Sequence, residues 1–301
     1  MAIPTVYVSN DGPGGGTVTP ITIATNTAGT PIKVGGHPGQ IAITPDGKTA
    51  YVANPGSTTV IPIATATNKP GKPIKVGPNP SRFATRGLYI AITPDGKTAY
   101  VANLDSASVT PITIATNTPG TPIKVGNGPV GIAITPDGKT AYVADQNSGT
   151  VTPITIATNT PGAPINIGSV AAGIAITPDG KTAYVASEAS GTVTPIATAT
   201  NTAGKPIKVG RSPGQIAITP DGTAYVANRA SGTVTPIATA TNTAGKPIKV
   251  GGVGIAITPD GKTAYALNDF PGTLTPIATA TNTPGKAINV GLIPRAMAIT
   301  P

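Results

Sequence analysis

The sequence contains no cysteine, no tryptophan and a single histidine, and only 10% of its 301 residues are charged. Without cysteine the chain can form no disulfide, no zinc–thiolate centre and no thiol nucleophile. One histidine, His37, and one glutamate, Glu188, cannot supply a multi-histidine or HExxH metal site. A hard-cation site could use Asp145 or Glu188, but no recognisable cation-binding loop surrounds them. We therefore expect no metal, no cofactor and no catalytic residues.

Long stretches free of glycine and proline are also missing, because the chain has 38 Gly and 34 Pro. Helical bundles need such stretches, so an all-α protein is excluded. No apolar run approaches the roughly 20 residues of a membrane-spanning helix, and we expect no membrane insertion. The N-terminus has neither a basic region nor a long apolar run, so the sequence predicts no signal peptide in this chain.

What the sequence has instead is one unit repeated along its whole length. The turn Thr-Pro-Asp-Gly returns about every 42 residues, with its prolines at Pro45, Pro94, Pro136, Pro178, Pro220 and Pro259. A Tyr-Val-Ala-Asn segment or a near copy begins at Tyr7, Tyr51, Tyr100, Tyr142, Tyr184, Tyr225 and Tyr265. In one unit, residues 131–135, 140–145, 150–156 and 164–167 have strand character and are separated by turn residues. This pattern predicts an all-β fold, a seven-bladed β-propeller of four-stranded antiparallel blades, forming a single domain over residues 1–301.

The two ends of the chain predict how the ring closes. The chain begins on the second strand of a unit, Thr5 to Asn10, and finishes on a first strand, Ala296 to Thr300. One blade must then combine both termini, with its innermost strand supplied by the C-terminus, which removes an open edge from the ring.

In each repeat unit, a proline stands in the middle of the predicted third strand. Proline cannot donate a hydrogen bond to a β-ladder and normally avoids interior strands, so we expect a bulge or a break at each of these positions. The seven residues are Pro20, Pro62, Pro111, Pro153, Pro195, Pro236 and Pro276.

The repeated string Ile-Ala-Ile-Thr-Pro-Asp-Gly-Lys-Thr-Ala-Tyr-Val-Ala-Asn, followed by Ser-Gly-Thr-Val-Thr-Pro-Ile, resembles the YVTN family of β-propeller repeat proteins over essentially the whole chain. The resemblance implies a propeller of the quinoprotein-dehydrogenase-like kind, often secreted or attached to the cell surface and commonly without an assigned activity. One departure is that the third strand carries Ala64 or Thr22 where this family often has Asp. The uniformity of the units is also typical of a consensus-like engineered scaffold.

The unusual residues gather on one face of the predicted ring. We call this the top face; it holds the loops from second to third strands and from fourth to first strands. It carries every Arg, both Phe, the only His and the only Tyr outside a second strand. Loops on a rigid scaffold carry function, and Arg and aromatic residues dominate binding surfaces. The candidate ligand- or partner-binding residues are therefore Arg82, Phe83, Arg86, Tyr89, Arg211, Arg229, Phe270, Arg295 and His37.

These features lead us to expect a non-enzymatic scaffold or interaction module, a monomer that binds a protein or surface ligand through the top face. The alternative is a lyase- or hydrolase-type enzyme with its site at the channel mouth, using Arg82, Arg86, Glu188 and His37. A third interpretation follows from the net charge of +9, which would permit weak binding of DNA or another polyanion. Most Lys residues lie on the predicted outermost strands, as in Lys33 and Lys124, where they protect exposed edges. Specific nucleic-acid binding is therefore not expected.

Overall fold

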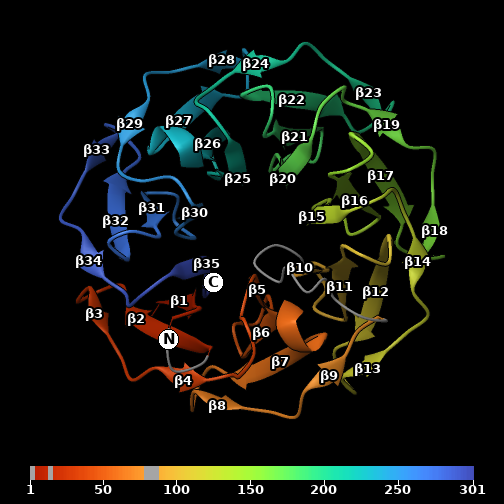
Figure 1. Ribbon diagram of the computed structural model, residues 1–301. Helices are drawn as coiled ribbons and strands as arrows, with labels where there is room; N and C mark the ends of the chain where they lie inside the picture. The colour runs from red at the N-terminus through yellow and green to blue at the C-terminus, as the bar shows by residue number, and fades with distance from the viewer. Residues whose placement is uncertain (1–3, 13–15, 78–87) are drawn as a thin grey trace.

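Seven antiparallel sheets are arranged around a central channel (Figure 1). The computed structural model describes residues 4–12, 16–77 and 88–301, and these residues form no α-helix. Two short 3₁₀ helices, η1 (Pro55–Ser57) and η2 (Arg229–Ser231), open two of the top-face loops. The predicted seven-bladed all-β propeller is confirmed.

The innermost strand of each blade lines the channel and carries the Ile-Ala-Ile pattern or a variant of it. Its partner, the second strand, carries Tyr-Val-Ala-Asn and is buried along nearly its whole length. The innermost strands are β5 (Ile41–Ile43), β10 (Leu88–Ile92), β15 (Pro129–Ile134), β20 (Ala171–Ile176), β25 (Pro213–Ile218), β30 (Gly254–Ile257) and β35 (Pro294–Ile299). The second strands are β1 (Thr5–Asn10), β6 (Thr49–Asn54), β11 (Thr98–Asn103), β16 (Thr140–Asp145), β21 (Thr182–Ser187), β26 (Thr223–Asn228) and β31 (Thr263–Asn268).

The third strands pair with the second strands in unbroken register, and each outermost strand is split into two short pieces. The third strands are β2 (Thr17–Thr22), β7 (Thr59–Ala64), β12 (Ser108–Thr113), β17 (Thr150–Thr155), β22 (Thr192–Ala197), β27 (Thr233–Ala238) and β32 (Thr273–Ala278). The first outer pieces are β3 (Thr27–Ala28), β8 (Lys69–Pro70), β13 (Thr118–Pro119), β18 (Thr160–Pro161), β23 (Thr202–Ala203), β28 (Thr243–Ala244) and β33 (Thr283–Pro284). The second outer pieces are β4 (Ile32–Lys33), β9 (Ile74–Lys75), β14 (Ile123–Lys124), β19 (Ile165–Asn166), β24 (Ile207–Lys208), β29 (Ile248–Lys249) and β34 (Ile288–Asn289).

The mid-strand prolines explain why the outermost strand is split. In the second blade, Pro62 stays in register with Tyr51 of the second strand, while β8 and β9 pair with β7 on either side of the proline. The Pro62 carbonyl accepts a hydrogen bond from the Gly71 N–H at 2.7 Å, so this edge of Pro62 faces the outermost strand. The missing proline N–H therefore costs a bond only on the outer side. The third strand itself shows neither the predicted bulge nor a break at Pro62, and the interruption falls in the outermost strand instead.

The ring closes in the blade that contains both termini. Strand β35 pairs antiparallel with β1, with Val6 opposite Ile299, and becomes the innermost strand of that blade. The Thr5 N–H donates to Thr300 Oγ1 at 2.8 Å, and the Thr300 N–H donates to the Thr5 carbonyl at 3.0 Å. The predicted closure by the C-terminal strand is confirmed.

The hydrophobic core lies between neighbouring blades. One cluster, for example, joins Tyr51, Val60 and Val76 of the second blade to Val101 and Ile112 of the third. The tyrosine of each second strand is buried, and its hydroxyl donates to an asparagine Oδ1 in the turn between the third and outermost strands of a neighbouring blade. Six of these seven bonds measure 2.5–2.7 Å, and the seventh, from Tyr265 to Asn26 across the closure, measures 3.4 Å. The repeated tyrosine therefore joins the blades to one another.

The turns on the opposite face, which we call the bottom face, repeat one hydrogen-bond pattern. In the second blade, Asp46 Oδ1 accepts from Thr44 Oγ1 at 2.6 Å and from the Lys48 N–H at 3.0 Å. These bonds lower the pKa of the Asp46 carboxyl, because they favour its charged form. The turn aspartates are thus structural residues that fix the Pro-Asp-Gly turns.

Candidate functional site at the channel mouth

A cavity of about 140 Å³ occupies the top end of the central channel, and residues from all seven blades line it. One set of lining residues stands directly after the second strands: Asp11, Pro55, Gln146, Glu188 and Arg229. The other set stands just before or at the start of the innermost strands and includes His37, Gln40, Tyr89, Val130, Ala172, Gln215, Val253 and Arg295. The lining is therefore built from the positions where the repeat is least uniform.

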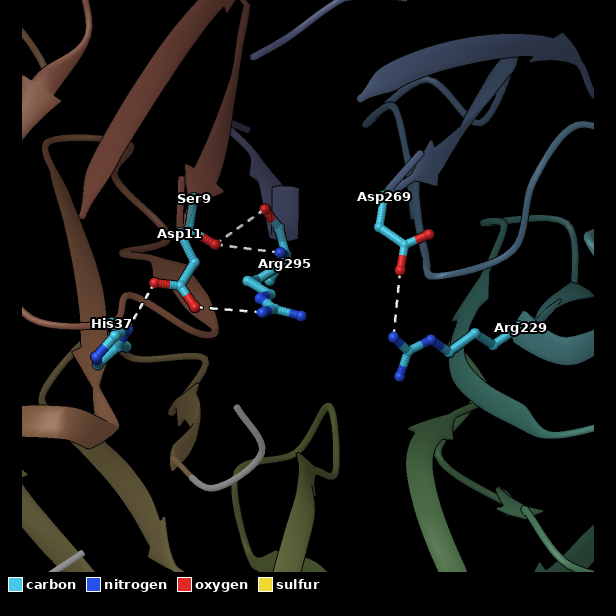
Figure 2. Close-up of polar contacts among 7 residues, drawn as sticks. Ser9, Asp11, His37, Arg229, Asp269 and Arg295 are labelled. Carbon is cyan, nitrogen blue, oxygen red and sulfur yellow. Dashed lines mark hydrogen bonds and ion pairs between the residues drawn. The ribbon is translucent and has the colours of Figure 1, made fainter. Parts of the chain in front are cut away.

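The Asp11 carboxylate contacts both His37 and Arg295 in the lining of the cavity (Figure 2). Its Oδ1 lies 2.7 Å from His37 Nδ1, and its Oδ2 accepts from Arg295 Nη2 at 3.2 Å. The Asp11 side chain is only 10% exposed, compared with 23% for Arg295 and 58% for His37. A carboxylate removed from water strengthens both interactions and holds the two partners in fixed positions.

The closure of the ring assembles this group of three. Asp11 follows β1 near the N-terminus, and Arg295 lies on β35 at the C-terminal end of the chain. Two further contacts fix the junction: the Asp11 N–H donates to the Ile293 carbonyl at 3.1 Å, and the Ala296 N–H donates to Ser9 Oγ at 3.1 Å. The Asp11–His37–Arg295 group is therefore complete only when the N-terminal strand β1 pairs with the C-terminal strand β35.

A second ion pair faces this group from the other side of the close-up (Figure 2). Arg229 Nη2 lies 3.2 Å from Asp269 Oδ2, with the Arg229 side chain 47% exposed and the Asp269 side chain 17% exposed. A guanidinium has five N–H donors, so this pairing leaves most of them available to a ligand. Among the described residues, the cavity thus presents two arginines, each held by an aspartate.

The structure divides the predicted site residues into three groups. His37, Tyr89, Arg229 and Arg295 line the cavity together. Arg211 and Phe270 are exposed top-face residues outside the lining; Arg211 Nη2 donates to the Ala230 carbonyl at 3.3 Å, and Phe270 is 73% exposed. The remaining predicted residues, Arg82, Phe83 and Arg86, lie outside the described residues.

Asp11, Gln40 and Gln146 line the cavity but were not predicted as site residues. Asp11 and Gln146 could have been found by reading the residue that follows each Tyr-Val-Ala-Asn segment, since that position lines the cavity in five blades. Glu188, which the enzyme alternative named, also occupies this position. Gln40 gives no comparable signal, because its position carries small residues in most blades.

Asp145 is a buried carboxyl next to the cavity, at a position where several blades have Asn. Its Oδ2 accepts from Thr152 Oγ1 at 2.6 Å and from Thr150 Oγ1 at 3.2 Å, while its Oδ1 has no partner within the described part of the chain. Burial raises the pKa of Asp145 to about 6, because the charged form loses its water.

Residues 4–12, 16–77 and 88–301 contain no group of three or more His, Asp or Glu residues that could hold a metal ion. The same residues include no helix of the length and apolar character needed to cross a membrane.

The match to a family of known proteins covers nearly the whole chain. A family model described as "Lactonase, 7-bladed beta-propeller" matches residues 4–301. The protein belongs to this lactonase family. No curated protein matches the chain.

Solved structures share the fold of this lactonase-family protein. Hydrazine synthase from Kuenenia stuttgartiensis is 26% identical, with a TM-score of 0.78, covering 88% of this chain and 90% of that one. A structure from Bacteroides fragilis NCTC 9343, named "putative 6-phosphogluconolactonase", is 20% identical, with a TM-score of 0.77 and coverage of 99% and 98%. A protein of unknown function from Desulfotomaculum acetoxidans DSM 771 is 19% identical, with a TM-score of 0.80 and coverage of 98% of both chains.

The family membership overturns the expectation of a non-enzymatic scaffold. A lactonase family points to hydrolytic chemistry, and the prediction that the protein is not an enzyme, with an interaction role for the top face, is therefore wrong. The composition was misleading because it is dominated by the repeat, which accounts for the fold and does not indicate a reaction. The enzyme alternative, with a site at that mouth, agrees better with the family.

Proposed function

We propose that this protein is a lactone hydrolase whose active site is the cavity at the top of the channel. The observation that carries the proposal is the Asp11–His37–Arg295 group in a cavity lined by all seven blades of a lactonase-family chain. Lactone hydrolysis needs a base to activate water and a cation to stabilise the oxyanion, and this group provides both.

His37 acts as the general base in the proposed reaction. Its Nδ1 lies 2.7 Å from Asp11 Oδ1, so a neutral ring donates its Nδ1 proton to the carboxylate and leaves Nε2 unprotonated. Nε2 takes a proton from a water molecule while the water oxygen attacks the lactone carbonyl carbon. Asp11 is then positioned to stabilise the imidazolium that forms.

Arg295 and Arg229 stabilise the negative charge that develops on the carbonyl oxygen. Each is held by an aspartate, Asp11 or Asp269, at 3.2 Å and retains N–H donors for the substrate. When the tetrahedral intermediate collapses, the bond from the carbonyl carbon to the ring oxygen breaks. The imidazolium returns its proton to that oxygen, so one water and one lactone give one hydroxy acid.

The test is the hydrolysis of simple δ-lactones by the purified protein and by matched variants. We expect His37→Gln to lower kcat by about 10²-fold or more, the usual contribution of a general base, and Arg229→Gln to lower kcat/KM by about tenfold or more. Arg211→Gln is the control, because Arg211 is a top-face arginine outside the cavity. The activity of this variant should equal that of the unmodified protein. Equal activity of all four proteins, or none above the uncatalysed rate, would refute the proposal.

We further propose that the blades are YVTN-type repeats within the lactonase fold. The seven Tyr-Val-Ala-Asn segments and their near copies, which form the second strands, support this assignment. Its test is structural: Tyr-to-Phe substitution in one of these strands should weaken the ring without changing hydrolysis.

A further inference from the structure

Two glutamine side chains in the cavity have no hydrogen-bond partner in the part of the chain that the structure describes. The amides of Gln40 and Gln146 make no hydrogen bond to any residue of the described ranges, although both side chains line the cavity. Their backbones are fixed: the Gln40 carbonyl accepts from the Ala53 N–H at 2.9 Å, and the Gln146 N–H donates to the Gly128 carbonyl at 2.8 Å. Each side-chain amide is therefore attached to a fixed backbone, and its NH2 group and carbonyl oxygen are available for hydrogen bonds.

Gln215 provides an internal comparison for Gln40. Both residues belong to the same local sequence, Pro-Gly-Gln-Ile, at the start of an innermost strand. The Gln215 Oε1 accepts a hydrogen bond from the Ile255 N–H of the next blade at 3.0 Å. The fold therefore uses Gln215 to join two blades, but it makes no such use of Gln40.

The blade architecture does not require an amide at this position. Two other blades have Gly131 and Gly173 there, and a Cβ on them would lie 2.5 and 2.3 Å from the carbonyl oxygens of Ala172 and Gly214. Those blades leave no room for a side chain and still form complete sheets. Gln40 is thus an addition to a blade that the fold could build with glycine.

Gln146 is likewise independent of the repeat. It follows the second strand β16, and the same position in other blades carries Pro55, Glu188 or Arg229. Half-buried polar groups without a protein partner are satisfied by water until a ligand supplies an equivalent bond. Polar side chains that line a ligand cavity fix the orientation of a ligand.

We propose that Gln40 and Gln146 are specificity-determining residues that hydrogen-bond uncharged hydroxyl groups of the substrate. This inference rests on the proposed function. It predicts that the enzyme prefers a lactone with hydroxyl groups on its ring over a lactone without them. A site with unused hydrogen-bonding groups disfavours an analogue that lacks the matching hydroxyl, because its amides would lose water without gaining a partner. Neither residue takes part in the proton transfers assigned to His37.

The experiment measures kcat/KM for glucono-δ-lactone and for δ-valerolactone, which shares the ring but has no hydroxyl group. Gln40→Met and Gln146→Met keep the side-chain length and remove the amide. Each should reduce the preference for the hydroxylated lactone by about tenfold, the value of one hydrogen bond. The rate with δ-valerolactone should change little. Gln215→Met should lower the Tm by removing the bond to Ile255. The control for the preference is Asp137→Asn, in a bottom-face turn outside the cavity, which should leave the preference unchanged.

The result that overturns the inference is an unchanged preference in both variants while hydrolysis continues. If the unmodified protein hydrolyses neither lactone, the proposed function fails, and calorimetry with glucono-δ-lactam and δ-valerolactam then tests the glutamines alone. Tighter binding of the hydroxylated lactam, lost in Gln40→Met and Gln146→Met, would support the inference. Equal binding of the two lactams by the unmodified protein would refute it.

Discussion

The top and bottom faces of this propeller are built from the same strands, but the bottom-face turns repeat from blade to blade and the top-face loops do not. On the bottom face, five of the six Pro-Asp-Gly turns repeat the same bonds, as between Asp46, Thr44 and the Lys48 N–H, and the Asp221 turn keeps only the threonine bond. On the top face, equivalent positions hold different side chains, and their partners come from distant parts of the chain, as Asp11 and Arg295 show. The Pro-Asp-Gly turns of the bottom face therefore depend on residues that are close in the sequence, while the Asp11–Arg295 contact on the top face forms only when the ring closes.

The largest expected effect comes from breaking the closure that the top-face group depends on. Deleting residues 294–301 removes β35, whose residues Ala296 and Met297 are each only 2% exposed, and uncovers the edge of β1. We expect a loss of at least ~5 kcal/mol of stability, because a buried strand and the ring closure are lost together. Thermal unfolding followed by circular dichroism measures this. Deletion of the exposed Pro301 alone is the control, and equal melting of both truncated proteins would contradict the closed-ring account.

The same substitution made on each face should separate function from folding. Asp11→Asn weakens the contacts to His37 and Arg295 and should lower kcat for lactone hydrolysis by about 10²-fold, because it disturbs both the base and the cation. Asp137→Asn, in a bottom-face turn, should leave kcat unchanged. Steady-state kinetics on both variants measures the difference. Parallel losses of activity would show that the two faces do not divide these tasks.

The sequence predicted the bottom face and the strands almost completely, because their information is local. Pro-Asp-Gly turns and the Tyr-Val-Ala-Asn segments act within a few residues, so their period reveals the blades. The sequence also placed His37, Arg229 and Arg295 on the top face, where the structure has them lining the cavity. It could not pair Asp11 with Arg295, 284 residues away, or separate Arg229 from Arg211, because these outcomes depend on ring closure and on how each loop turns.

The buried carboxyl of Asp145, next to the cavity, is expected to lower the free energy of unfolding at neutral pH. Its pKa is about 6 in the folded protein, above the ordinary value of 3.8, so folding favours the protonated form. Stability should therefore fall as the pH rises from about 4 to 6, when the unfolded chain ionises first, and stay low above that range. Asp145→Asn should remove this dependence and stabilise the protein at pH 8 by about 2–3 kcal/mol. Chemical denaturation at pH 4 and pH 8 measures it, and an Asp145→Asn protein that is less stable at pH 8 would contradict the burial argument.

The smallest expected effect concerns a single inter-blade bond on the bottom side of the ring. Tyr100→Phe removes the hydroxyl that donates to Asn159 at 2.6 Å and keeps the buried ring. We expect a loss of about 1 kcal/mol, the net value of one such hydrogen bond, with unchanged kcat. Urea unfolding and lactone kinetics on the same sample measure both quantities. A fall in kcat without a fall in stability would show that the bottom face reaches the site.

The tyrosine-to-asparagine bonds also make the blades interchangeable units. Every blade donates through a tyrosine on one side and accepts through an asparagine on the other, with the same groups in all seven positions. A gene segment encoding one blade could be duplicated in tandem, and the new copy would meet complementary groups on both flanks. New blades could thus be added without inventing new contacts, and only the few side chains at the channel mouth would have to change for a new chemistry to arise.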